Sequence, residues 1–74
     1  MNWNEIISKR TPVRTKDSTT FGYVADEYKD TFVVIEGKLV SHGYAFPKDK
    51  ADHYDGRQLS LKMRQDEIGS DYEI

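Results

Sequence analysis

Two histidines and the aspartates near them are the residues best suited to chemistry. His42 stands before a glycine, and His53 lies in the segment KDKADHYDG with Asp49, Asp52 and Asp55. Imidazole nitrogens and carboxylate oxygens can bind a metal ion when three or four of them converge at ~2 Å from it. The same residue types are also typical of turns. Surface turns are the favoured interpretation, and a small ligand- or metal-responsive region around His42 and His53 is the alternative.

An acidic group stands in the middle of the chain. Asp26, Glu27 and Asp30 fall within the segment ADEYKD, where paired carboxylates could act as acid and base or hold calcium. The spacing and the glycine of a calcium loop are absent. The group therefore favours a solvated hairpin tip.

The remaining polar residues match no catalytic pattern. No serine lies in a local nucleophile signature, and no glycine opens a helix that could hold a phosphate. The chain has no cysteine, which excludes thiol catalysis and thiolate metal sites. The sequence therefore predicts a protein that is not an enzyme and that uses no cofactor.

Charge and aromatic content bear on the kind of partner. Tyr23, Tyr28, Tyr44 and Tyr54 could stack on bases, but 11 basic against 13 acidic residues give a net charge of -2 and no field that would hold a polyanion. A protein partner is expected rather than nucleic acid. Residues 1–16 are mainly basic and residues 65–74 carry only acidic charges, so the two ends could attract each other within one chain or between copies.

The length of 74 residues gives room for one domain, residues 1–74, with an ordered core over 3–68 and a frayed acidic tail over 69–74. The longest apolar run is residues 32–35, against the ~20 residues of a membrane-spanning helix. The start of the chain lacks the apolar stretch of a signal peptide. A soluble, cytoplasmic protein without membrane insertion is expected.

The elements that would position these residues are short and mostly extended. Trp3, Ile6 and Ile7 have helical spacing, and Pro12 ends that helical turn. Alternating and apolar runs predict a strand at residues 13–15, a strand that begins at residue 21 and leads to a turn at 28–31, and further strands at 32–35, 44–47 and 57–64. Other turns are expected at 16–20 and 36–38, a loop at 48–56 and a helical turn at 65–68.

Two features of the central hairpin give the fold its shape. Gly22 interrupts the alternation between Phe21 and Val24, which is typical of a bulge or tight bend. Residues 32–35 (FVVI) are apolar on both faces, so each face needs a cover. The pattern as a whole predicts a mostly β fold, a small, strongly bent antiparallel β-barrel or roll of five to six strands with short helical turns at both ends.

The order of these segments resembles the PRC-barrel superfamily, the barrel shared by reaction-centre H subunits and a ribosome-maturation factor. The resemblance rests on FGYV at 21–24, the polar stretch 25–30, the strand ending in glycine at 32–37, YAFP at 44–47 and the Asp-Gly hairpin entering LSL at 55–61. It is strongest to small stand-alone members from bacteria and archaea. It implies a protein-binding barrel, often homo-oligomeric and in some archaea attached to the cell-division machinery, and it implies no catalytic residues.

The functional hypothesis from the sequence is a non-enzymatic interaction or adaptor domain that associates with itself or with a partner protein. The candidate interaction surface consists of Trp3, Tyr23, Val33 and Ile35, around the strand that is apolar on both faces. Trp3 has two possible roles here, because it can cover an open end of the fold or form part of the interface.

Overall fold

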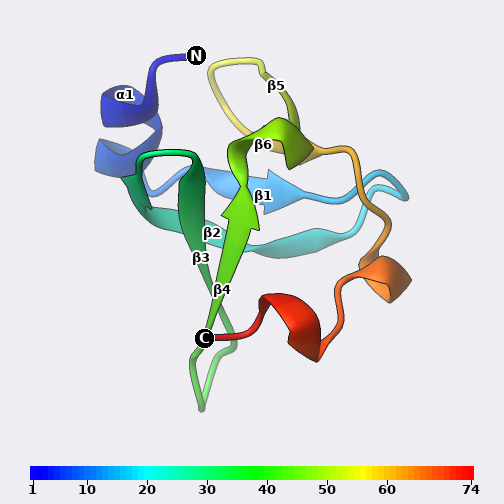
Figure 1. Ribbon diagram of the computed structural model, residues 1–74. Helices are drawn as coiled ribbons and strands as arrows, with labels where there is room; N and C mark the ends of the chain where they lie inside the picture. Colours follow the sequence, from blue (N-terminus) through cyan, green and yellow to red (C-terminus); the bar gives the residue numbers. More distant parts are fainter.

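The chain forms a six-stranded sheet that bends around its own core, as seen in a computed structural model that describes residues 1–74 (Figure 1). One short helix, α1 (Trp3–Ser8), precedes the sheet. The strands are β1 (Pro12–Arg14), β2 (Thr20–Tyr28), β3 (Thr31–Glu36), β4 (His42–Pro47), β5 (Ala51–Tyr54) and β6 (Leu59–Leu61). Three 3-10 turns follow or separate them, η1 (Lys48–Lys50), η2 (Gln65–Glu67) and η3 (Ser70–Tyr72).

Helix α1 confirms the predicted N-terminal helical turn. The Asn2 side chain accepts a hydrogen bond from the Glu5 amide at 3.2 Å, which caps the first turn. Ile6 is fully buried, whereas Trp3 and Ile7 are partly buried against the core. None of the helical segments is long and apolar enough to cross a membrane.

The sheet is mixed and open. Its strand order is β4-β3-β2-β1-β6-β5, and β4 and β5 are the two edges. Four neighbouring pairs are antiparallel, but β1 and β6 run parallel, with Val13 opposite Leu59. The expectation of an entirely antiparallel arrangement is therefore wrong at this pair, because alternation along a strand carries no information about the direction of a distant partner.

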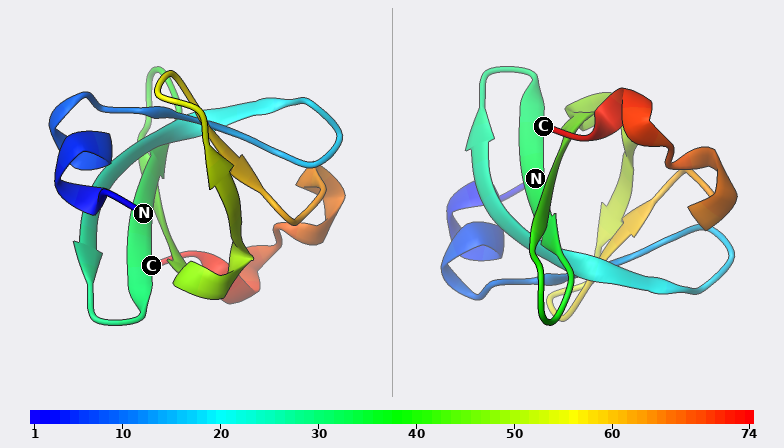
Figure 2. Two further views of the ribbon diagram at one scale, coloured as in Figure 1. Left: turned by 90° about the horizontal axis from the view of Figure 1, so that it is seen from above. Right: turned by 90° about the horizontal axis from the view of Figure 1, so that it is seen from below.

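The long strand β2 gives the sheet its curvature, and Figure 2 shows it sweeping across the molecule. Its first part pairs with β1 and its later part with β3, with a register shift in each ladder. Gly22 has φ +71°, and a Cβ at this position would lie 2.1 Å from the carbonyl oxygen of Ile35. The predicted glycine bend is confirmed, and its cause is the close approach of β2 to β3.

The core lies inside the bend and is rich in aromatic residues. The rings of Phe32 and Phe46 are 5.6 Å apart, and that of Phe21 is 4.9 Å from Tyr44. The buried apolar residues are Ile6, Val13, Phe21, Val24, Phe32, Val34, Phe46, Ala51, Leu59, Leu61 and Met63.

Several predicted boundaries differ from the structure. The supposed loop at 48–56 contains the strand β5, which pairs with β6. The strand predicted over 57–64 is limited to Leu59–Leu61, although Leu59, Leu61 and Met63 are buried together as expected. Asp26 and Glu27 belong to β2, so the hairpin tip consists of Lys29 and Asp30 alone. Pairing with the neighbouring strand sets these boundaries, and the residue types of the segment alone do not show it.

The C-terminal residues pack against the rest of the protein. The helical turn expected at 65–68 is present as η2. The sequence predicts fraying for residues 69–74, whereas in the structure η3 lies beside β4 and the Tyr72 ring is 5.2 Å from that of Phe46. Figure 1 shows the chain ending beside the first part of β4.

Candidate interaction surface

Strand β3 divides its apolar residues between two faces. Phe32 and Val34 are fully buried in the core, whereas Val33 and Ile35 point to the opposite face and are half-buried. The alternation follows from the two-residue repeat of a strand. One apolar face of residues 32–35 therefore packs in the core, and the other forms part of the molecular surface.

Neighbouring strands extend this surface on both sides of β3. Ile35 stands opposite Tyr23 in β2 and opposite Gly43 in β4, and Val33 stands opposite Ala45. Ile74 reaches the same place, since a Cβ on Gly43 would lie 3.4 Å from its Cδ1 and 3.7 Å from that of Ile35. We call this surface the outer apolar face; it consists of Tyr23, Val33, Ile35, Ala45 and Ile74.

Charged side chains flank the outer apolar face. At the β2 side, the Arg10 guanidinium carbon lies 5.9 Å from the centre of the Tyr23 ring. Beyond β4, Ile74 belongs to the acidic segment 69–74. Glu73 pairs with Tyr44 and its Oε2 lies 3.0 Å from His42 Nδ1, so this carboxylate lies on the face of the sheet opposite to Ile35. Burial raises the pKa of Tyr44 above its usual value, and the carboxylates of Glu73 and Glu36 raise it further.

Trp3 does not lie on the outer apolar face. Its ring packs against Phe32 at 5.0 Å, on the core side of β3. Lys48 Nζ lies 5.2 Å from the Trp3 ring centre and 2.6 Å from Glu27 Oε2. Of the four residues predicted for the interaction surface, the structure brings Tyr23, Val33 and Ile35 together and places Trp3 as a cover of the core.

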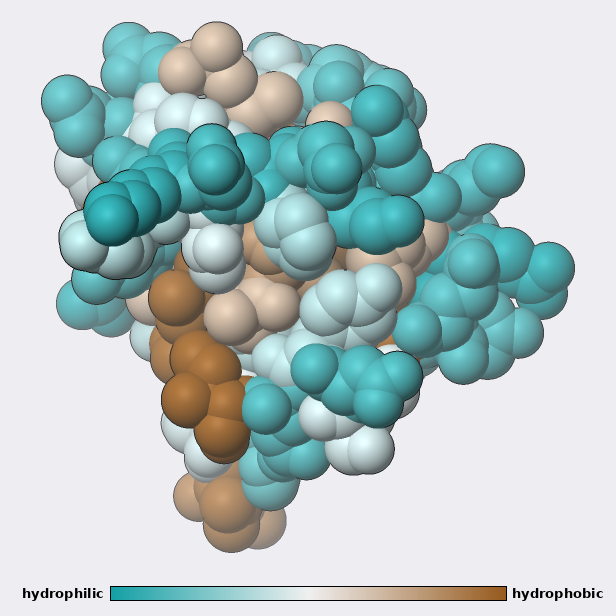
Figure 3. All heavy atoms as spheres, viewed as in Figure 1, coloured by the Kyte–Doolittle hydropathy of each residue, from teal (hydrophilic) through white to brown (hydrophobic).

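The hairpin between β3 and β4 carries an exposed apolar pair that the sequence analysis did not include in the interaction surface. Leu39 is 100% exposed and Val40 67% exposed. Figure 3 shows hydrophobic residues gathered near the C-terminal end and again at the lower tip of the molecule, where this hairpin lies. Two aliphatic residues between the glycines at 37 and 43 were the available signal, since loops rarely need them.

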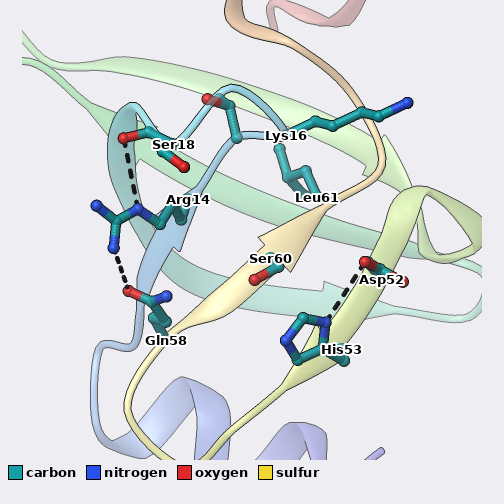
Figure 4. A pocket seen from close by; sticks show the side chains of 9 residues that line it. Arg14, Lys16, Ser18, Asp52, His53, Gln58, Ser60 and Leu61 are labelled. Carbon is teal, nitrogen blue, oxygen red and sulfur yellow. Dashed lines mark hydrogen bonds and ion pairs between the residues drawn. The ribbon is translucent and has the colours of Figure 1, made fainter.

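A separate polar hollow lies over β1, β6 and β5 (Figure 4). Its volume is about 460 Å³, and Leu61 is its only hydrophobic lining residue. Arg14 at the rim donates long hydrogen bonds of 3.4 Å to the Ser18 carbonyl and to Gln58 Oε1. On the other side, His53 Nδ1 lies 3.4 Å from Asp52 Oδ2.

The hollow contains one of the two histidines singled out in the sequence. His53 lies in the edge strand β5, whereas His42 opens the other edge strand, β4, and contacts Glu73. No group of three or more histidine, cysteine, aspartate or glutamate side chains is arranged to hold a metal ion. Asp55 accepts hydrogen bonds from the amides of Arg57 and Gln58, both at 2.8 Å. Such bonds from an aspartate to the backbone that follows it are typical of turns.

The tyrosines considered for base stacking occupy different environments. Tyr44 and Tyr54 pack partly buried against the core, and the Tyr54 hydroxyl donates to Glu5 Oε2 at 2.8 Å. Tyr28 is 69% exposed at the end of β2. Packing against the core thus explains the presence of Tyr44 and Tyr54 without base stacking.

No protein-family model, curated protein or solved structure matches this chain. The resemblance to the PRC-barrel superfamily therefore stays a prediction from the sequence pattern. What the structure defines is a class of fold, a small, mostly β protein with a bent, open, mixed sheet and one N-terminal helix.

Proposed function

We propose that this protein is a non-enzymatic interaction domain that associates with a second copy of itself through the outer apolar face. The observation that carries the proposal is the outward face of β3, where Val33 and Ile35 are only partly buried and lie near Ile74, which is 77% exposed. Burying an aliphatic side chain of this size contributes about 1.5–3 kcal/mol when it starts fully exposed. Several such residues must be covered together, because association itself costs several kcal/mol.

The charges near the two ends of this face favour a second copy as the partner. Arg10 lies beside Tyr23 at one end of the row that passes through Ile35, and the other end is Ile74, which belongs to the acidic segment 69–74. A twofold axis through this row would place Arg10 of each copy near the acidic segment of the other. Such self-complementarity is what a symmetric dimer requires.

Light scattering coupled to size exclusion tests the proposal. We expect the wild-type chain to form a dimer in a concentration-dependent manner, and Val33→Asp or Ile35→Asp to give a folded monomer. Tyr28→Asp is the matched control, since it adds the same charge at the exposed end of β2. A wild-type chain that stays monomeric at millimolar concentration would refute the proposal.

The wider role proposed for such a domain is that of an adaptor or scaffold within a larger assembly. Membership of the PRC-barrel superfamily, and with it a place in an assembly such as an archaeal or bacterial cell-division machinery, belongs to the same proposal. The bent six-stranded sheet supports it, and a closed barrel would further require β4 and β5 to pair.

A second candidate function is binding of a small polar ligand or metal ion in the hollow that contains His53. The volume of about 460 Å³ falls in the range of small-molecule sites, and its lining is almost entirely polar. A thermal-shift series with zinc and nickel tests it. Stabilisation that is lost in His53→Ala and kept in His42→Ala supports the candidate, and no stabilisation by either ion removes it.

A further inference from the structure

The last residues of the C-terminal segment, Glu73 and Ile74, lie along the edge of the sheet as an added strand would, directly after the 3-10 turn η3. The amide of Ile74 donates a hydrogen bond to the carbonyl of Gly43 at 2.8 Å. Glu73 and Tyr44 form an antiparallel bridge. The edge strand β4 is thus occupied at its first half by the chain's own C-terminal segment.

Three consecutive side chains of the segment each have a defined contact. The Tyr72 ring lies 5.2 Å from that of Phe46, and Glu73 Oε2 lies 3.0 Å from His42 Nδ1. Ile74 lies over Gly43, where an added Cβ would be 3.4 Å from its Cδ1. The edge therefore accommodates an aromatic, an acidic and an aliphatic residue in that order.

Edge strands bind extended peptides through main-chain hydrogen bonds, and neighbouring side-chain contacts supply the specificity. We propose that the β4 edge is a peptide-binding site for a short segment of a partner protein with the order aromatic–acidic–aliphatic, whose last two residues are extended as Glu73 and Ile74 are. The chain's own residues 72–74 fill the site in the absence of that partner and act as an intramolecular competitor.

The competitor is tethered but weakly held. Within residues 69–74 only Tyr72 is partly buried, and the remaining side chains are exposed. A segment with so few buried contacts opens more easily than the core does. A short tether nevertheless gives it an effective concentration in the millimolar range, so an external peptide binds well only when the segment is displaced.

The experiment uses the full chain and the synthetic hexapeptide Gly-Ser-Asp-Tyr-Glu-Ile, which copies residues 69–74. Its binding is followed through amide shifts in ¹⁵N-labelled wild-type protein and in Tyr72→Ala. We expect half-saturation of Tyr72→Ala at a peptide concentration about tenfold lower than for the wild type, because the competing segment is loosened. Amide shifts are expected from Gly43 to Phe46.

Two controls make the outcome specific. A peptide with alanine in place of its tyrosine should bind neither protein, and Tyr28→Ala, which removes an exposed tyrosine elsewhere, should behave as the wild type. Equal affinity of the wild type and Tyr72→Ala, or shifts away from β4, would overturn the proposal. If Tyr72→Ala fails to fold, millimolar peptide added to the wild type must still shift the β4 amides, and no shift there overturns it equally.

Discussion

Gly22 occupies a backbone position at which a side chain cannot be accommodated. Its φ is +71°, and an added Cβ would meet the Ile35 carbonyl oxygen at 2.1 Å. We expect Gly22→Ala to lower the free energy of unfolding by about 2 kcal/mol or more, since positive φ and a backbone clash both oppose it. Gly69→Ala is the matched control, because no atom lies within 4 Å of its Cβ. Urea unfolding of both variants measures the difference, and equal losses would contradict the explanation.

Asp17 links the turn after β1 to the C-terminal part of the chain. The Thr15 hydroxyl donates to its carboxylate, and the Gln65 amide donates at 3.2 Å. These bonds, the Thr15 bond foremost, hold the pKa of Asp17 below its ordinary value of 3.8.

A lowered carboxyl pKa in the folded state adds stability that is present above pH 3.8 and is lost as the pH falls through the folded pKa. We therefore expect Asp17→Asn to be less stable than the wild type at pH 7 and to approach it at pH 2.5. Urea unfolding at the two pH values gives the comparison. A difference that is the same at both would mean that ionised Asp17 is not the acceptor of these bonds.

At the scale of elements, α1 is held to the sheet chiefly through two apolar side chains. Ile6 is fully buried, and the Trp3 ring lies 5.0 Å from Phe32. Trp3→Ala should lower the free energy of unfolding by about 2–3 kcal/mol, less than for a fully buried tryptophan because Trp3 is only partly buried. Trp3→Phe should lose less than half as much, since a ring remains against Phe32. Circular dichroism during urea unfolding measures both, and equal losses would show that the ring contact does not hold the helix.

At the scale of the whole molecule, the proposed dimer predicts a charge-exchange result. In Arg10→Glu the basic end of the row becomes acidic in both copies, and in Glu73→Lys the segment 69–74 loses an acidic charge and gains a basic one. Each variant alone should therefore dimerise more weakly than the wild type. An equimolar mixture should recover dimers, because positions 10 and 73 of the two copies then carry opposite charges. Light scattering of the mixture measures this, and no recovery would place the interface elsewhere.

The sequence by itself determined the local structure of this protein. The helical spacing near the start of the chain, the Gly22 bend, the apolar run of β3 and the Asp-Gly turn before β6 are each specified by a few consecutive residues. Short-range sterics and the repeat of side chains along a strand suffice for such features. The choice of Tyr23, Val33 and Ile35 for one surface also followed from this repeat and from the turn that pairs their strands.

The tertiary structure alone decided what depends on contacts between distant segments. The parallel pairing of β1 with β6 and the position of Trp3 on the core side both depend on partners far away in the chain. The position of residues 72–74 against β4 depends on such a contact too. The acidic composition of this segment alone predicts a frayed tail. Composition and periodicity are properties of a segment alone. The free energy that the segment gains by packing depends on the part of the protein that it contacts.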